Sequence, residues 1–175
     1  ATDALLEVAA VLIGMNKERN LFCQNTIFTH VRPFVGANLE PASLEVNGID
    51  PFHPLRIALT EKDALQKIFK PVREHVKLNK CTRAILVGHN AFFDLGFINA
   101  AAERAGIKNN PFHPFSNFDT VTLGALAYGQ TVLSRIVEAA DIDWDNSSAH
   151  SAMYDAEKTA AVFCNVMNKW RQLQA

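Results

Sequence analysis

A long stretch near the C-terminal end of the chain carries apolar residues at the spacing of an α-helix. A stripe of this kind covers one helix face and is stable only when it packs against another layer of structure. The pattern therefore predicts one long amphipathic helix lying on a sheet or on other helices. The residues of the stripe are Ala149, Ala152, Met153, Ala156, Ala160, Phe163, Val166, Met167 and Trp170.

Segments earlier in the chain have the character of β-strands. Residues 4–13 are mostly apolar, and residues 26–31 alternate and contain several β-branched side chains. The polar stretch between them, residues 15–20, is typical of a turn, so the two segments predict an antiparallel hairpin. Residues 84–87 form a short apolar run that ends at Gly88, which predicts a buried parallel strand.

The remaining elements are mainly helical. Residues 32–59 contain most of the prolines and predict a long loop region. Thr60 and Asp63 have the spacing of a helix start, and Pro71 predicts a kink or break in the helix that follows. Further helices are expected at 92–105, 120–128 and 131–140, with a short strand near Phe118. The order β-β-α-β-α-α-α predicts a single-domain α/β sandwich with a mixed sheet flanked by helices, spanning residues 1–175.

Composition excludes several classes of protein. Lys plus Arg (17) nearly balance Asp plus Glu (18), so a strongly basic coat for nucleic acid is excluded, but a local basic patch is not. The longest apolar run, Val8–Met15, is too short to span a membrane, and no signal peptide is visible. The three cysteines form no CxxC pair, which favours buried thiols in a reducing compartment. We therefore expect a cytoplasmic protein with no membrane partner.

One group of polar residues follows the strand at 84–88. His89, Asn90 and Asp94 stand where this strand passes into a helix. Ligands of α/β proteins gather at the carboxyl ends of strands, so Asp94 is a candidate for a metal or substrate role. The structural alternative is that Asp94 caps the helix and His89 packs beneath it.

A second group opens the long C-terminal helix. His150 and Asp155 would not share a helix face if both were helical. They converge if His150 lies in the preceding loop and Asp155 in the first turn. A histidine beside a carboxylate is suited to activate a water molecule as a general base. The pattern is short and also occurs by chance.

Oxygen ligands for Mg²⁺ and surfaces for a nucleic acid are also present. Carboxylates suit Mg²⁺, and Asp94, Asp119 and Asp155 come from three elements, although Asp119 has no motif and a structural role is favoured for it. Phe93 and Phe115 could stack on unpaired bases, whereas the default for phenylalanine is the core. A set of cations could bind phosphates or simply form a solvated face. These cations are Arg73, Lys77, Lys80, Arg83 and Lys108.

Taken together, residues 89–94 and 150–155 resemble the second and third motifs of the DEDD exonucleases, and the histidine resembles that of the DEDDh branch. The resemblance covers essentially the whole chain. Four further segments are similar to the ribonuclease T family within that branch. They are residues 33–39, 47–51, 110–115 and 129–133.

This resemblance implies a ribonuclease H-like fold and a Mg²⁺-dependent 3′→5′ exoribonuclease. Such an enzyme trims the 3′ ends of tRNA and other stable RNAs, including ribosomal RNA precursors, and releases 5′ mononucleotides. Two Mg²⁺ ions are expected per site, with Mn²⁺ as a possible replacement. The family works as a homodimer in which a basic patch on one subunit delivers RNA to the other. By position, Asp94 and Asp155 match metal ligands, and His150 matches the general base. The positions that match substrate contacts are Lys77, Arg83 and Lys108 in the basic patch, and Phe93 and Phe115 against the terminal bases.

The chain departs from the family pattern at three places. The first motif, Asp-x-Glu on the first strand, is absent, and we expect this strand to lie upstream of residue 1. Val46 stands where the family has a stacking phenylalanine, and Ala42 stands where it has a glutamate that contacts the end base. Both differences bear on whether this protein shares the family's reluctance to remove terminal cytosines. Two alternatives remain open: a DEDDh enzyme acting on single-stranded DNA ends or short oligonucleotides, and an inactive module that binds RNA ends. A Cys-His hydrolase is disfavoured, because no cysteine lies in a suitable context.

Overall fold

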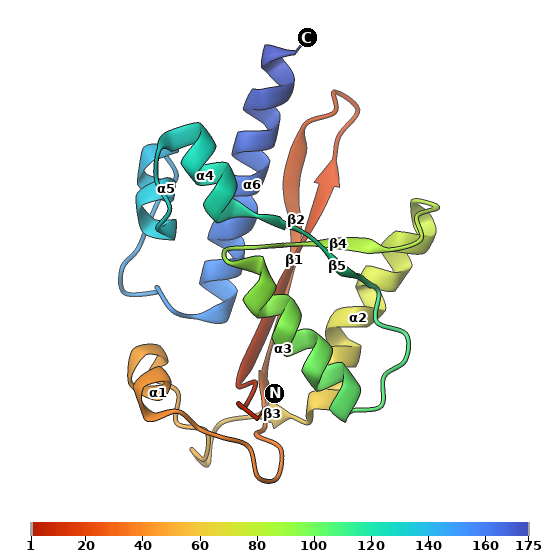
Figure 1. The fold of residues 1–175 in the computed structure, drawn as a ribbon, viewed down its shortest axis with the longest axis vertical. Helices are drawn as coiled ribbons and strands as arrows, with labels where there is room; N and C mark the ends of the chain where they lie inside the picture. Colours follow the sequence, from red (N-terminus) through yellow and green to blue (C-terminus); the bar gives the residue numbers. More distant parts are fainter. Residues whose placement is uncertain (1, 175) are drawn as a thin grey trace.

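A computed structural model describes residues 2–174 of the chain. Two long strands come first, and a 22-residue helix comes last. The ribbon in Figure 1 shows how the elements between them are arranged. In chain order they are β1 (Glu7–Met15), β2 (Leu21–Val31), α1 (Pro41–Asn47), β3 (Ala58–Leu59), α2 (Glu61–Leu78), β4 (Ala84–Gly88), α3 (Ala91–Arg104), β5 (Phe112–Asp119), α4 (Thr120–Tyr128), α5 (Leu133–Ala139) and α6 (Ala152–Leu173).

The strands form two separate sheets. In the first, β1 and β2 pair antiparallel and β3 joins β2 in parallel, so this sheet is mixed. In the second, β4 and β5 pair in parallel. Each sheet has the order of its strands along the chain, so β1 lies at one edge of the first sheet and β4 lies at one edge of the second. Within residues 2–174, neither edge has a paired neighbour.

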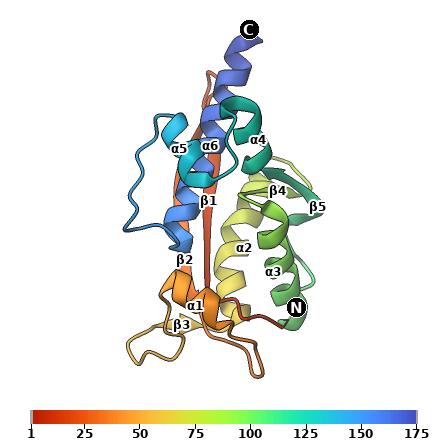
Figure 2. The same ribbon diagram turned by 60° about the vertical axis from the view of Figure 1, so that its left-hand side comes forward.

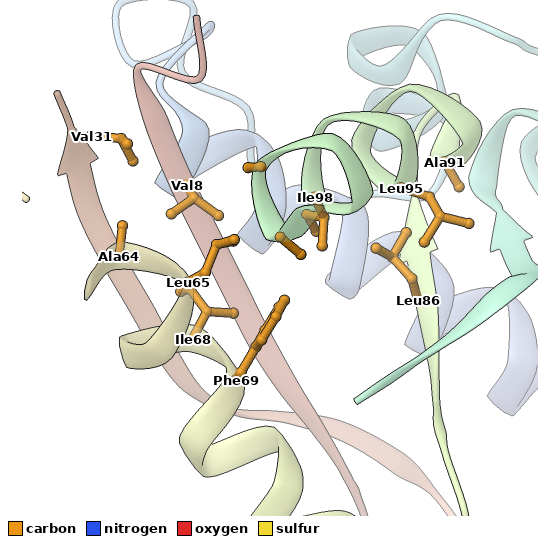
Figure 3. Packing of buried hydrophobic residues seen from close by; sticks show 12 residues of the cluster. Val8, Val31, Ala64, Leu65, Ile68, Phe69, Leu86, Ala91, Leu95 and Ile98 are labelled. Atoms are coloured by element: carbon orange, nitrogen blue, oxygen red, sulfur yellow. The ribbon is translucent and has the colours of Figure 1, made fainter. Parts of the chain in front are cut away.

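Helices cover the hairpin of β1 and β2 from both sides. Figure 2 shows α2 and α3 on one side of the hairpin, and α5 and α6 on the other. The main core joins the first group to the strands, and Figure 3 shows Leu65 and Phe69 of α2 packed on the side of the core that faces Val8 of β1 and Ile98 of α3. Leu65 and Phe69 are fully buried. A second, smaller core packs α5 against α6.

Several predictions from sequence are confirmed. The hairpin, the strand ending at Gly88 and the long C-terminal helix all form. Thr60 caps α2, because its side-chain oxygen accepts a hydrogen bond from the backbone N–H of Asp63 at 3.2 Å. No helix within residues 2–174 is long and apolar enough to cross a membrane.

Other predictions need correction. The expected loop at residues 32–59 contains α1 and β3, and the strand near Phe118 is the eight-residue β5. Helix α2 runs through Pro71 without a break, since the buried residues Ile68, Phe69 and Val72 on both sides of it anchor the helix to the core. Of the three thiols expected to be buried, only Cys164 is; Cys23 and Cys81 are exposed.

Candidate active site

A cleft of about 1520 Å³ lies between the two sheets. Residues of β1 line it on one side and residues of β4 on the other, and one face of α6 contributes Ala152, Asp155, Ala156, Thr159, Ala160 and Phe163. Both polar groups singled out in the sequence open onto this cleft. They bring Asp94, His150 and Asp155 to its wall, together with His89 and Glu7.

Asp94 is held at the end of β4 by a close approach of backbone and side chain. It is the fourth residue of α3, and Asn90, in the left-handed conformation with φ 63°, is the N-cap. A Cβ on Gly88 would lie 2.9 Å from Asp94 Oδ2 and 2.8 Å from Ala91 Cα. Glycine is therefore required at position 88 for the carboxylate to pack against the strand end. Asp94 does not cap α3, so this part of the structural alternative is wrong, whereas His89 is part-buried against Thr120.

The surroundings of Asp94 favour its protonated form. The carboxyl group is reached by solvent, yet protein atoms surround it in the cleft, and this desolvation raises the pKa of Asp94 to about 6. The backbone N–H of Asp94 opposes the shift, and the negative charge of Asp119 adds to it. A carboxylate in such a setting is stabilised by any cation placed beside it.

His150 and Asp155 converge in the way that the loop position of His150 predicts. His150 lies just before α6 with φ 70°, the left-handed region, and Asp155 lies in the first turn of the helix. The backbone N–H of His150 donates to the Asp155 carboxylate. Burial nevertheless raises the pKa of Asp155, against this hydrogen bond and the electrostatic effect of the His150 and His89 side chains. The imidazole of His150 is exposed.

Glu7 belongs to the same wall and was not found from the sequence. Its Oε2 accepts a hydrogen bond from the backbone N–H of Ala152 at 3.4 Å, at the first turn of α6. Its Oε1 lies 2.9 Å from Nδ1 of His30. Ser151, the N-cap of α6, makes no side-chain cap bond, so the carboxylate of Glu7 takes that place from a distant strand. An acidic residue within an apolar strand was the one available signal.

Asp119 and His89 hold the starts of α3 and α4 together through hydrogen bonds. Asp119 Oδ1 accepts from the N–H groups of Asn90 (3.1 Å) and Val121 (2.9 Å), and Oδ2 accepts from Ala91 (3.1 Å). His89 Nδ1 lies 3.0 Å from the hydroxyl of Thr120, and burial lowers the pKa of His89. These contacts fit the structural role favoured for Asp119.

The donor set for a metal is only partly present. Among residues 2–174, no three His, Cys, Asp or Glu side chains stand close enough together to hold an ion. Asp94 and Asp155 supply carboxylate oxygens, the ligand type that Mg²⁺ prefers, and Mg²⁺ is commonly held by one or two carboxylates plus substrate phosphates. The residues present therefore fit Mg²⁺ in kind.

The predicted substrate contacts lie in two regions. Phe93 is exposed on the cleft wall with its ring 4.8 Å from that of Phe97, whereas Phe115 is exposed on β5 and does not line the cleft. Val46 is exposed on α1, and this helix faces the cleft through three neighbouring residues. The cations lie near the other end of β4: Lys77 in the last turn of α2, Arg83 just before β4, where it also lines the cleft, and Lys108 in the loop after α3.

Residues 1–163 match the model of the RNase_T family, which is described as an exonuclease family. The chain belongs to this exonuclease family. The match covers every residue of the cleft wall named above and both motifs of the DEDD type.

Solved structures of exonucleases share the fold. Exonuclease I of E. coli in complex with a dT13 oligonucleotide superposes with a TM-score of 0.66 at 17% identity, over 95% of this chain and 38% of that one. A 3′-exonuclease in 3′-end specific recognition of a histone mRNA stem-loop gives 0.65 at 14%, over 96% and 66%. The nuclease domain of 3′hExo, a DEDDh family member, bound to rAMP, gives 0.60 at 15%, over 95% and 94%. The chain thus spans little more than a third of Exonuclease I. The predicted single-domain α/β, ribonuclease H-like fold is confirmed.

Proposed function

We propose that this chain is the catalytic domain of a Mg²⁺-dependent 3′→5′ exoribonuclease that trims the 3′ ends of tRNA and other stable RNAs. The observation that carries the proposal is the meeting of Asp94, Asp155 and His150 on one cleft in a chain of the exonuclease family. These side chains come from the first turn of α3, the start of α6 and the loop before it.

The roles of the side chains follow from their chemistry. Asp94 and Asp155 would hold Mg²⁺, which when bound neutralises charge on the phosphodiester. His150, exposed in its loop, would take the proton of the attacking water as general base. The backbone N–H of His150 and the carboxylate of Glu7 keep the loop and the first turn of α6 in place for that transfer. Phe93 would stack on a terminal base.

The cleft between the two sheets leaves room for a further strand that carries the first motif, Asp-x-Glu. The unpaired edges of β1 and β4 both line the cleft, and sheet edges are stable when another strand pairs with them. A strand placed between them and running parallel to β4 would end beside Asp94 and Asp155. Two carboxylates at that end, the Asp-x-Glu pair, would complete a site for two ions. We infer that the cleft is the position of this strand.

The basic residues support a dimer rather than a single self-contained site. Arg83 and Asp94 flank the two ends of β4, and a five-residue strand spans roughly 16 Å. Lys77, Arg83 and Lys108 therefore lie away from the carboxylates of their own chain. A second copy of the chain would bring these cations to RNA held at the first copy's cleft.

The test uses RNA labelled at the 5′ end, incubated with Mg²⁺ and the protein purified from its source. We expect stepwise shortening from the 3′ end and release of 5′ mononucleotides. Asp94→Asn and Asp155→Asn should each lower the rate by about 100-fold or more, because a metal contributes several kcal/mol of charge stabilisation. Asp143→Asn is the matched control, since Asp143 is exposed and lies outside the cleft. Rates like those of the control in both variants would refute the assignment.

Substrate and completeness are tested separately. RNA and DNA of equal sequence are offered in competition, and preferred cleavage of DNA would favour the alternative DEDDh enzyme. The intact mass of the protein is compared with 19.4 kDa, the mass of this chain. A larger mass is expected if the first strand exists. Binding of RNA ends without cleavage at a mass of 19.4 kDa would favour the second candidate, an RNA-end-binding module, which the small metal donor set of residues 2–174 supports.

A further inference from the structure

Strand β2 and helix α6 lie side by side and run in opposite directions, tied together at two points. At one end, the hydroxyl of Thr26 donates to Oε1 of Glu157 at 2.7 Å. At the other, the side chain of Asn168 bonds both the N–H and the carbonyl of Leu21, at 2.7 and 2.9 Å. Thr26, Glu157 and Asn168 do not line the cleft of the candidate active site, although Leu21 does. The region therefore lies largely outside that cleft.

The two tie points are a similar distance apart along both elements. From Leu21 to Thr26 the strand advances five residues, but a bulge between Cys23 and Thr26 makes them pair with only four steps of β1, about 13 Å at 3.3 Å per residue. From Glu157 to Asn168 the helix advances eleven residues, about 17 Å at 1.5 Å per residue. Because the strand is regular from Leu21 to Cys23, before the bulge, positions near the Leu21–Asn168 tie can be matched by their distance from it along the two elements.

Two cysteines occupy matching positions between the ties. Cys23 is two strand residues from Leu21, about 7 Å, and Cys164 is four helix residues from Asn168, about 6 Å. The thiols of Cys23 and Cys164 lie close enough for each to shift the pKa of the other. Cys23 is exposed, whereas Cys164 is buried with 6% of its surface accessible. One thiol is thus open to reagents and the other is held behind it.

The contact also makes the two thiols chemically different. The hydrogen bond from Cys164 lowers the pKa of Cys23 to about 7, against its partial burial and the nearby charge of Glu157. The same contact, together with burial, raises the pKa of Cys164. The thiolate is the reactive form of cysteine, so Cys23 is the nucleophile of the pair and Cys164 is placed to resolve its oxidised form.

We propose that Cys23 and Cys164 are a redox-active pair that peroxide converts into a disulfide joining β2 to α6. The Cys23 thiolate attacks hydrogen peroxide, the O–O bond breaks, and Cys23 becomes a sulfenic acid with release of water after protonation. The sulfur of Cys164 then attacks the sulfenic sulfur, and a second water leaves. In sum, two thiols and one hydrogen peroxide give one disulfide and two water molecules, and a dithiol reductant reverses the change.

The oxidised pair would fix the helix that carries Asp155. Cys164 lies in the middle of α6, and Asp155 lies in its first turn. A covalent bond from this point to β2 would keep the middle of the helix attached to the strand. We expect a rise of several degrees in Tm on oxidation, because a cross-link between distant residues constrains the unfolded chain.

The experiment treats the purified protein with hydrogen peroxide in non-reducing buffer, then counts free thiols and maps peptides by mass. The wild-type protein should lose two of its three thiols, lose two hydrogens in mass and give a peptide linking Cys23 to Cys164. Cys81→Ser is the matched control and should form the same link, since Cys81 is also exposed but lies in another region. Dithiothreitol should restore the thiols.

Single variants keep the test decisive. Cys23→Ser should leave Cys164 unreacted, and Cys164→Ala should leave Cys23 as a sulfenic or sulfinic acid without a link. Because Cys164 is buried, folding of Cys164→Ala is checked by circular dichroism. If Cys164→Ala does not fold, the result for Cys23→Ser, which changes an exposed position, decides the test. A link through Cys81, or over-oxidised Cys23 with no link in the wild-type protein, would overturn the proposal.

Discussion

Replacing Asp119 tests whether its carboxylate holds the starts of α3 and α4 in place. It accepts three backbone N–H groups, and two of them belong to the start of α3 and one to the start of α4. A single side chain thus caps α4 and binds the turn at Asn90 from which Asp94 is presented. Removing it would leave three donors without their partner and would take a negative charge from two helix N-termini.

The magnitude follows from these bonds. Loss of an N-cap side chain costs about 1 kcal/mol, and each further hydrogen bond to a charged group contributes about 1.5 kcal/mol or more before water replaces it. Since Asn90 is exposed and water reaches its N–H, we expect Asp119→Ala to lower the free energy of unfolding by about 3 kcal/mol. In a chain of this size, that loss lowers Tm by roughly 6–12 °C.

Asp119→Asn separates shape from charge. The amide oxygen can still accept from Asn90 and Val121, but its NH₂ group would face the N–H of Ala91, so we expect a smaller loss of about 1–2 kcal/mol. Urea unfolding followed by circular dichroism measures both variants, with the exposed Asp143→Ala as control at about 0.5 kcal/mol or less. If Asp119→Ala unfolded at the same urea concentration as the control, the structural role described here would be refuted.

Three further predictions concern the cleft. Gly88→Ala should cost about 1–3 kcal/mol and displace Asp94, because its Cβ would meet Ala91 Cα and Asp94 Oδ2 at 2.8 and 2.9 Å; urea unfolding and RNA cleavage report the two effects. The pKa of Asp94 is raised from 3.8 to about 6, so the folded protein binds this proton more tightly than the unfolded chain, and the resulting stability, complete below pH 4, is lost as pH rises through 6. In metal-free protein, Asp94→Asn should therefore gain in Tm relative to wild type between pH 4 and 7, and an unchanged difference would contradict the raised pKa. Glu7→Ala should lose about 1–3 kcal/mol in urea unfolding, whereas Glu7→Gln keeps an acceptor for the N–H of Ala152 and should lose less.

Local signals predicted those parts of the fold that depend on near neighbours in the chain. The cap at Thr60, the turn between β1 and β2 and the stripe of α6 each follow from residues a few positions apart. Helix α1 and strand β3 were missed, because the first has seven residues and the second has two, and neither has room for a period to repeat. The effect of Pro71 was overestimated because tertiary burial on both sides of it outweighs one lost hydrogen bond.

The site was predictable only where a residue carries its own motif. Asp94 and Asp155 each belong to a recognisable segment, and the loop position of His150 made its approach to Asp155 an expected result. Glu7 has no such segment, since its role depends on α6 lying across β1, which no local pattern encodes. The contact between Cys23 and Cys164 has the same origin, because it joins residues on two elements at opposite ends of the chain.

Two features of residues 2–174 have one common explanation in the proposed strand. The first sheet ends at β1 and the second at β4, and both edges carry main-chain groups with which a further strand could form hydrogen bonds. The acidic group at the end of the same cleft is too small to hold a metal by itself. A strand between β1 and β4 would join the two sheets and would end where carboxylates are lacking. Because that strand would also bring new negative charge beside Asp94, the completed site should bind Mg²⁺ more tightly than this chain alone, and titration of Mg²⁺ into both forms measures the difference.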